Sequence, residues 1–255
     1  MEIIGLDLFS KHFTEHREKF VLIGGSACHL NLEEQGLKFR TTKDLDIVLL
    51  FDIEILDTQF TKCLWDFIKM AGYTIQYRSS GKPVFFRFEK PKDKNFPVMI
   101  ELFSHKLDAF ELNGGTQCTP IPVEDELSSL SAILLNDKYY DLITNSYKTI
   151  NNVPIVTPEC LIALKVKAFL NLTERKAAGE DIDANKIKKH KNDVFRVAQI
   201  LTEDKTCTVA PQIIEDLKQF IDLIRKEPPD LKGLGIRGIT ADEVLELIRK
   251  VYVMK

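Results

Sequence analysis

The stretch that decides the fold reads DLDIVLLF and runs from Asp44 to Phe51. Because it is apolar and rich in β-branched residues after its first three positions, it predicts a β-strand. Side chains alternate between the two faces of a strand, so Asp44 and Asp46 project from one face while Leu45 and Ile47 project from the other. Two carboxylates this close repel each other unless a cation lies between them. The pattern therefore predicts a divalent metal site, with Mg²⁺ preferred because hard carboxylate oxygens suit it.

A second motif, Gly24-Gly25-Ser26, follows the short apolar run Phe20 to Ile23. It predicts a turn from a strand into a helix, with Ser26 as the helix cap, an end near Gln35 and Gly36 as the stop. Glycines let backbone N–H groups approach an anion, and a helix N-terminus carries a partial positive charge. No Gly-Lys-Ser/Thr follows, so this is not a Walker loop. The turn predicts a site for phosphate groups.

A third carboxylate, Glu101, interrupts the apolar run VMIELF between Val98 and Phe103. A carboxylate in such a run is usually paired, exposed at an edge or bound to a metal. If its strand lies beside the Asp44 strand, the three acids converge and can hold two Mg²⁺ ions, or Mn²⁺ in their place. Two-metal sites suit in-line phosphoryl or nucleotidyl transfer.

The order of these patterns along the chain predicts an α/β (α+β) fold. Its first part, residues 1–156, is expected to be a small mixed β-sheet core with flanking helices. Thr157-Pro158-Glu159 is a strong helix start and opens a helical subdomain, residues 157–255. In the first part we expect helices over about 6–19 and 54–71, strands over 73–77, 84–89 and 98–103, and a turn over 91–97. In the second part we expect helices from 158 to about 176, over about 183–201, and near 210–226 and 240–252.

Taken together, three segments carry a family resemblance: Ile23-Gly24-Gly25-Ser26, then Arg40-Thr41-Thr42-Lys43-Asp44-Leu45-Asp46-Ile47, and then Glu101. They resemble the nucleotidyltransferase superfamily related to DNA polymerase beta. The resemblance implies that the Gly-Gly-Ser turn binds the triphosphate, the two aspartates bind metal and the third carboxylate comes from a neighbouring strand. It implies an enzyme that transfers NMP from an NTP to an acceptor hydroxyl and releases pyrophosphate. The loop before the metal strand adds three candidate nucleotide ligands, Arg40, Thr42 and Lys43.

In the second half, PECLIALKVKA (158–168) and KKHKNDVFR (188–196) resemble the abortive-infection branch, whose members include toxins of bacterial toxin–antitoxin pairs. By this resemblance Lys165, with Lys167 as second choice, contacts the nucleotide phosphates. Lys191 and Asp193 match the last motif of the branch, where a role in activation or charge balance is expected. The resemblance also implies an acceptor, which is RNA, protein or a small molecule in this superfamily. It implies an antitoxin protein as a possible partner in the same way.

Composition limits the function classes further. Lys and Arg number 35 against 38 for Asp and Glu, so the net charge of −3 excludes a globally basic coat for nucleic acid. No apolar run reaches the roughly 20 residues of a membrane helix. The five cysteines are scattered and form no CxxC pair. Together with a first segment unlike a signal peptide, these features predict a cytoplasmic protein with reduced thiols and no membrane association.

Two alternatives to the enzyme stay open. A degenerate member of the same fold would bind a nucleotide or a partner protein without turnover. Separately, HFTEH from His12 to His16 fits the HxxEH pattern of a zinc hydrolase, although no third ligand is identified.

Overall fold

The computed structural model describes residues 3–40, 42–50, 58–75, 85–103, 111–112, 116–117 and 136–254. The chain forms two compact units. Unit 1 takes its described residues from 1–30, 40–124 and 147–156, and unit 2 takes them from 31–39, 125–146 and 157–255. Residues 31–39 and 125–146 were predicted to belong to the first part of the chain, residues 1–156.

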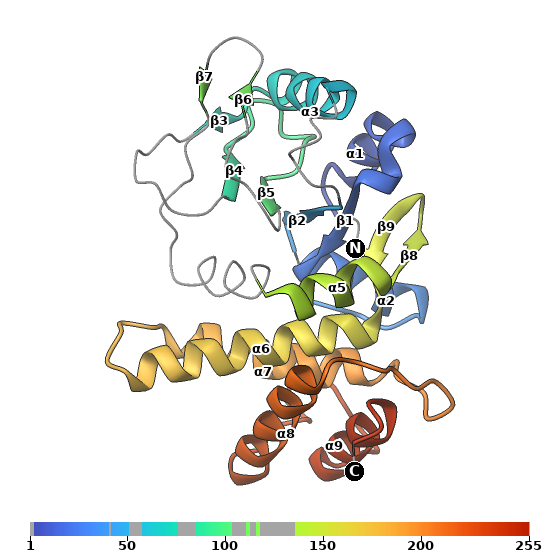
Figure 1. Cartoon of the computed structure of the whole chain (residues 1–255), viewed down its shortest axis with the longest axis vertical. Helices are drawn as coiled ribbons and strands as arrows, with labels where there is room; N and C mark the ends of the chain where they lie inside the picture. The colour runs from blue at the N-terminus through green and yellow to red at the C-terminus, as the bar shows by residue number, and fades with distance from the viewer. Residues whose placement is uncertain are drawn as a thin grey trace. The chain divides into compact units, whose positions relative to one another are not determined.

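Unit 1 is built on a mixed β-sheet, which has seven strands within the described residues (Figure 1). In spatial order these are β3 (Thr74–Ile75), β4 (Phe85–Glu89), β5 (Met99–Phe103), β2 (Asp44–Leu49), β1 (Phe20–Ile23), β9 (Val153–Val156) and β8 (Tyr147–Ile150). β2 pairs parallel with β5, and β1 pairs parallel with β9. The other neighbouring strands are antiparallel. A separate pair joins β6 (Glu111–Leu112) to β7 (Thr116–Gln117). The predicted fold class, a mixed sheet with flanking helices followed by helices, is confirmed.

Strand β2 lies in the middle of this sheet, and its two faces differ as its alternation predicts. Leu45, Ile47 and Leu49 are buried, whereas Asp44 and Asp46 are half-buried. The strand begins at Asp44 and ends at Leu49, and the predicted Phe51 lies outside the described residues.

Aromatic side chains cover the apolar face of the sheet. The face of Leu45 also carries Phe88 of β4, because β2, β5 and β4 are in register. Phe88 meets Trp65 of α3 (Thr58–Ala71) edge to face at 5.7 Å, and Phe20 of β1 meets Phe9 of α1 (Leu6–His12) at 5.3 Å. Aromatic pairs of this kind add to the stabilisation from buried area. The acidic side chains of β2 therefore lie on the face opposite this core.

The helices of unit 1 match their predictions in part. The expected helix over 6–19 is two segments, α1 and the 3-10 segment η1 (Thr14–Lys19), which are separated at Phe13; His16 adds a non-helical kink inside η1. α2 (Gly24–Glu34) begins at Gly24, so Ser26 lies inside its first turn and the prediction that it caps the helix was wrong. Gly36, with φ +70°, ends α2 as predicted.

The hairpin of β8 and β9 was missed by the sequence analysis. Its two-residue loop is Asn151-Asn152, and both residues have positive φ, 49° and 63°. Asparagine tolerates this left-handed backbone better than most residues, and a two-residue loop of this type joins twisted strands well. The Asn-Asn pair between two apolar runs was the feature of the sequence that could have predicted this hairpin.

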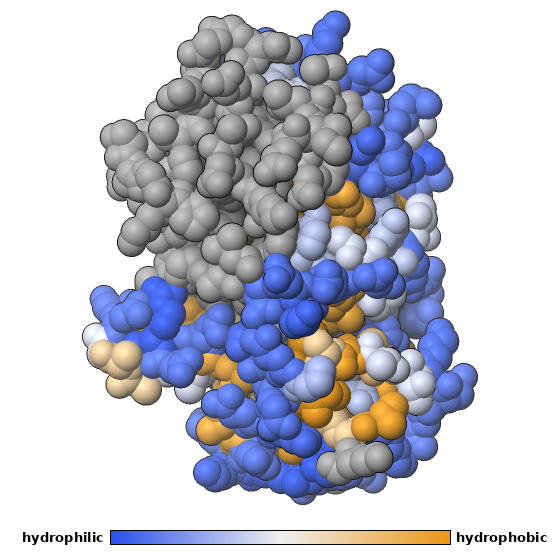
Figure 2. Space-filling view, viewed as in Figure 1, coloured by the Kyte–Doolittle hydropathy of each residue, from blue (hydrophilic) through white to orange (hydrophobic). Residues whose placement is uncertain are grey.

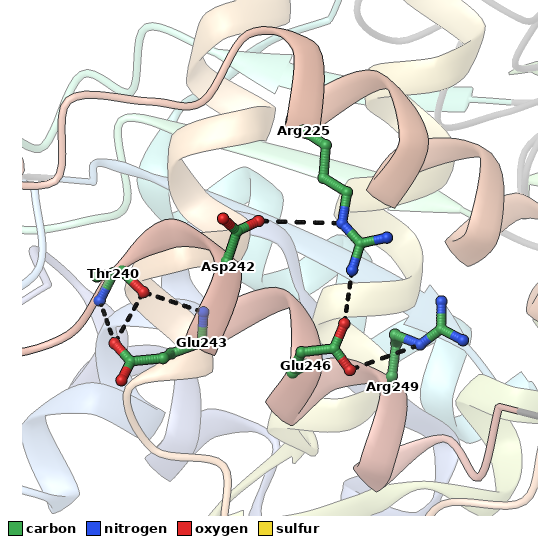
Figure 3. A network of polar contacts seen from close by, with 6 residues as sticks. All are labelled: Arg225, Thr240, Asp242, Glu243, Glu246 and Arg249. Atoms are coloured by element: carbon green, nitrogen blue, oxygen red, sulfur yellow. Dashed lines mark hydrogen bonds and ion pairs between the residues drawn. The ribbon is translucent and has the colours of Figure 1, made fainter.

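Unit 2 is helical in its described residues: α5 (Asp137–Asn145), α6 (Pro158–Ala177), α7 (Ala184–Ala198), α8 (Pro211–Lys226) and α9 (Ala241–Val251). The Thr157 hydroxyl accepts a hydrogen bond from the Cys160 backbone N–H at 3.4 Å, which confirms the predicted helix start. Thr240 and Glu243 form a capping box at the start of α9, and Glu246 of that helix binds Arg225 of α8 (Figure 3). These contacts fix where α9 begins and how it lies against α8.

A buried polar network joins three of these helices. The Tyr139 hydroxyl of α5 donates to Asp216 Oδ2 of α8 at 2.8 Å, and Lys167 Nζ of α6 lies 2.9 Å from Asp216 Oδ1. Tyr139 is fully buried, and burial raises its pKa far above the ordinary value. The carboxylate is thus satisfied by two partners, which is the condition for burying a charge without a large penalty.

Polar side chains cover much of the described surface in the view of Figure 2, with apolar ones in patches between them. Among the described residues no helix is both long and apolar enough to cross a membrane.

Candidate functional site

The candidate site lies on the acidic face of the unit 1 sheet. Asp46 of β2 pairs in register with Glu101 of β5, and Glu101 pairs in register with Arg87 of β4. Residues that pair directly across neighbouring strands share a face, so these three side chains form one row. Asp44 lies on the same face two positions before Asp46, where its backbone partner is Met99. The predicted convergence of Glu101 with the aspartate strand is therefore present at Asp46.

Glu101 is held by a cation that the sequence analysis did not name. Arg87 Nε donates to Glu101 Oε1 at 2.8 Å, and Arg87 Nη1 lies 3.2 Å from Glu89 Oε1. The side chains of Arg87 and Glu101 are 16% and 7% exposed, so the pair is largely withdrawn from water. The sequence offered one signal for this role of Arg87. In FFRFE, residues 85–89, Arg87 and Glu89 are two positions apart, so their side chains share one face of β4.

Asp46 and Glu101 also interact with each other. Burial first, and then the neighbouring Asp46 carboxylate, raise the pKa of Glu101 from 4.5 to about 9, against the opposing effect of Arg87. A hydrogen bond between the two carboxyl groups contributes to the rise. In the absence of a metal this pair therefore retains a proton at neutral pH.

The Gly-Gly turn is in contact with the acidic row. Gly24 has φ +66°, and a Cβ placed on it would lie 1.7 Å from Asp46 Oδ2. A Cβ on Gly25 would lie 2.8 Å from Thr42 Oγ1 and 3.6 Å from Arg40 Nη2. Only glycine leaves room for these approaches. The structure thus brings the turn, Asp46, Thr42 and Arg40 together, as the motif order predicts.

Ser26 has a different environment from the one expected of a phosphate ligand. It is fully buried, and its hydroxyl donates to the backbone carbonyl of Asp44 at 2.5 Å. This bond ties the first turn of α2 to the start of β2. Lys43, by contrast, is exposed, and its backbone carbonyl accepts from the Val98 N–H at 3.2 Å, next to the start of β5.

The residues that the resemblance adds from the second half lie in unit 2. Lys165 Nζ lies 3.4 Å from Asp193 Oδ2, and Arg196 Nη1 lies 3.1 Å from Asp193 Oδ1. Asp193 is completely buried. Lys191 Nζ donates to the Glu227 carbonyl at 3.3 Å. Lys165 therefore turns toward α7, and Lys167, two positions further, turns toward α8.

Among the described residues, no group of three or more His, Cys, Asp and Glu side chains is gathered closely enough to hold a metal. This also bears on the HxxEH pattern: His12 Nε2 lies 2.8 Å from the Cys63 carbonyl, and the His16 ring meets the Phe60 ring at 5.8 Å. Both histidines pack in the aromatic layer, and the kink at His16 removes the helical spacing that the zinc pattern requires.

Comparison with known proteins gives matches at the level of structure. No protein-family model and no curated protein matches the chain. One similar solved structure is an antigenic nucleotidyltransferase-like protein from Paracoccidioides brasiliensis, with 15% identity, 93% of each chain covered and a TM-score of 0.47. Another is the antibiotic-resistance factor ANT(2'')-Ia, with 12% identity, 88% of this chain and 96% of that chain covered, and a TM-score of 0.36.

Neither name refers to the abortive-infection branch.

Proposed function

We propose that the chain is a nucleotidyltransferase that moves NMP from an NTP to an acceptor hydroxyl. The observation that carries the proposal is the contact between the Gly24-Gly25 turn and Asp46, in the row that also contains Glu101. A phosphate-binding turn and a pair of carboxylates are separate requirements of this chemistry, and the fold brings them within atomic contact.

Asp46 and Glu101 supply two oxygen ligands of the kind that divalent metals prefer, and a third ligand would have to come closer than the described side chains lie. Asp46 and Glu101 are two acids in contact on a partly buried surface, and oxygen ligands of this kind suit Mg²⁺, with Mn²⁺ as the alternative. Asp44 is the third candidate ligand on the same face. When bound, such a metal lowers the pKa of the acceptor hydroxyl and neutralises charge on the phosphates.

The residues of the chain itself have distinct roles in this proposal. The backbone N–H groups at Gly24 and Gly25, at the positive end of α2, bind the phosphates, and Arg40 and Thr42 lie close enough to Gly25 to add a cation and a hydroxyl. The acceptor oxygen forms a bond to the α-phosphorus as the bond to the β-phosphate oxygen breaks, and the acceptor proton leaves to a base. Glu101 is the candidate for that proton.

The finer assignments are part of the same proposal. Lys165, Lys191 and Asp193 stay predictions from the resemblance, as do Mg²⁺ dependence, an RNA or protein acceptor, a toxin role with an antitoxin partner and a cytoplasmic location. Ser26 supports the site indirectly, because its hydroxyl holds the backbone of Asp44.

One observation favours a second candidate function, a nucleotide-binding module without turnover. The Glu101 carboxylate is already occupied by Arg87 at 2.8 Å, which competes with its use as a ligand or base. The two candidates differ in a single respect, the making and breaking of the phosphate bond.

The test has a binding arm and a transfer arm. In the first, ATP, GTP, CTP and UTP are titrated calorimetrically with and without Mg²⁺ into wild type, Asp44→Asn/Asp46→Asn and the control Asp222→Asn, an exposed aspartate of α8. The proposal expects Mg²⁺-dependent binding that only the double variant loses. Absence of binding in wild type would overturn both candidates.

In the second arm, NTP labelled at the α-phosphate or at the γ-phosphate is incubated with the protein, total RNA and a protein extract. Incorporation of the α-label alone, lost in the double variant, is the result expected of the enzyme. Binding without incorporation into any fraction, and without pyrophosphate release, would instead favour the module.

A further inference from the structure

We infer that unit 2 carries a second binding site, for a small amphipathic anion: a molecule with an apolar body and one carboxylate, sulfonate or phosphate group. The site is a cavity of about 680 Å³ between α6, α7, the end of α8 and the loop 228–234. Its size is in the range of small-molecule pockets. Every lining residue belongs to unit 2, and Lys191 is the one lining residue that the family resemblance also assigns to the nucleotide site.

The cavity has an apolar floor and an apolar wall that is not fully covered. Phe169 of α6 and Ile224 of α8 are buried at its floor. Ile187, Leu223 and Leu234 line it from α7, α8 and the loop, and each is only half-buried. Removing the remaining exposed surface of these three side chains from water is energetically favourable. The apolar body of a ligand would do this.

The charge around the cavity favours an anion. The charge of Lys191 already has a partner, because its ammonium group donates to the Glu227 carbonyl and lies 3.9 Å from the carboxylate of the same residue. Lys176 and Lys188 line the cavity from α6 and α7 and are exposed. Within the described part of the chain, neither ammonium group makes an ion pair or hydrogen bond. The remaining lining acid, Asp230, accepts from the Gly233 N–H at 3.1 Å. The lining therefore carries three lysines against two acids, Glu227 and Asp230, which leaves a small surplus of positive charge for a ligand.

The loop wall is already ordered before any ligand arrives. The Leu234 N–H donates to the Asp230 carbonyl at 3.1 Å, and the Ile236 N–H donates to the Leu231 carbonyl at 2.9 Å. Gly233 passes so close to Asp230 that an added Cβ would lie 2.5 Å from its Oδ2. A preformed wall lowers the entropy lost on binding. A partly apolar pocket with a fixed wall and two lysines that make no ion pair within the described residues therefore suits an amphipathic anion.

The test uses 8-anilinonaphthalene-1-sulfonate, an aromatic sulfonate whose fluorescence rises on binding. It is titrated into the full-length protein under native conditions. We expect one saturable site with a dissociation constant on the order of micromolar. Lys176→Gln/Lys188→Gln is expected to weaken binding about fivefold. Lys205→Gln, the same change at an exposed lysine outside the cavity lining, should leave it unchanged.

Two further measurements localise the ligand and its charge. Ala184→Trp places a bulky ring at an exposed position of the cavity lining and should abolish saturable binding, while the near-ultraviolet circular dichroism stays native. The neutral analogue N-phenyl-1-naphthylamine should bind about tenfold more weakly. The inference is overturned if wild type binds no sulfonate, or if neither the double variant nor Ala184→Trp alters binding. Equal affinity for the neutral analogue would overturn the assignment of an anion.

Discussion

The approach of Gly24 to Asp46 allows a sharp test of the site, by Gly24→Ala with Gly36→Ala as its control. Gly24 is the first residue of α2 and Gly36 lies just after its end, and both have left-handed backbones, with φ +66° and +70°. They differ in their surroundings. A Cβ on Gly36 meets nothing within 4 Å, whereas one on Gly24 lies 1.7 Å from Asp46 Oδ2. The control therefore shares the backbone penalty and lacks the collision.

The magnitude follows from these two contributions. A left-handed backbone costs a residue with a Cβ about 1–2 kcal/mol, which both variants lose in free energy of unfolding. In Gly24→Ala the Asp46 carboxylate must also move by about 1.3 Å, because its Oδ2 would lie 1.7 Å from the new Cβ and such contacts are essentially never shorter than 3.0 Å. Overpacking of this kind adds about 1–3 kcal/mol. We expect a loss of about 2–5 kcal/mol for Gly24→Ala and about 1–2 kcal/mol for Gly36→Ala.

The assay combines urea unfolding with calorimetric titration of Mg²⁺ and NTP. Gly24→Ala should lose Mg²⁺-dependent NTP binding at temperatures where it is fully folded, because Asp46 no longer occupies its place beside Glu101. Gly36→Ala should bind like wild type. If the two variants matched each other in both stability and binding, the argument that the turn and Asp46 form one site would be refuted.

Three further outcomes are expected. Asp46→Asn should abolish nucleotide transfer and leave the far-ultraviolet circular dichroism unchanged; transfer at the wild-type rate by the purified variant would contradict its role. In EDTA, the free energy of unfolding should fall as pH rises from about 4.5 toward 9, by at most about 1.4 kcal/mol per pH unit, because folding raises the pKa of Glu101 and the folded state therefore binds its proton more tightly than the unfolded state does. Urea midpoints measured across this pH range test the prediction. A midpoint that does not change with pH would contradict it. Tyr139→Phe should lower the free energy of unfolding by about 1.5–3 kcal/mol by removing the hydrogen bond to Asp216, measured by urea unfolding with the exposed Tyr147→Phe as a near-neutral control; equal losses in both variants would argue against the network.

Local patterns predicted the elements on which the site depends. The alternation in DLDIVL was enough to place Asp44 and Asp46 on one face, because strand geometry fixes that spacing wherever the strand lies. The helix start at Thr157 was predicted correctly, because a capping side chain binds a backbone N–H in the first turn of its own helix. The helix over 6–19 was predicted less well, since it is broken at Phe13 and kinked at His16, whose ring contacts Phe60 of α3.

The partners within the site were harder to predict. Arg87 was missed because its role depends on β4 lying beside β5, and nothing within FFRFE states which strand is its neighbour. Ser26 was expected at a helix cap and instead binds the Asp44 carbonyl, eighteen positions further along the chain. Such contacts depend on how distant segments are brought together.

The sequence by itself therefore determined most of the helices and the central strands of the sheet, the shared face of the two aspartates and the glycine at the start of α2, all of which follow from short-range backbone geometry. Only the tertiary structure decided that Glu101 lies opposite Asp46, that Arg87 holds it, and that Gly24 touches the Asp46 carboxylate. These are properties of strand order and register, which are set by the burial of side chains far apart in the chain.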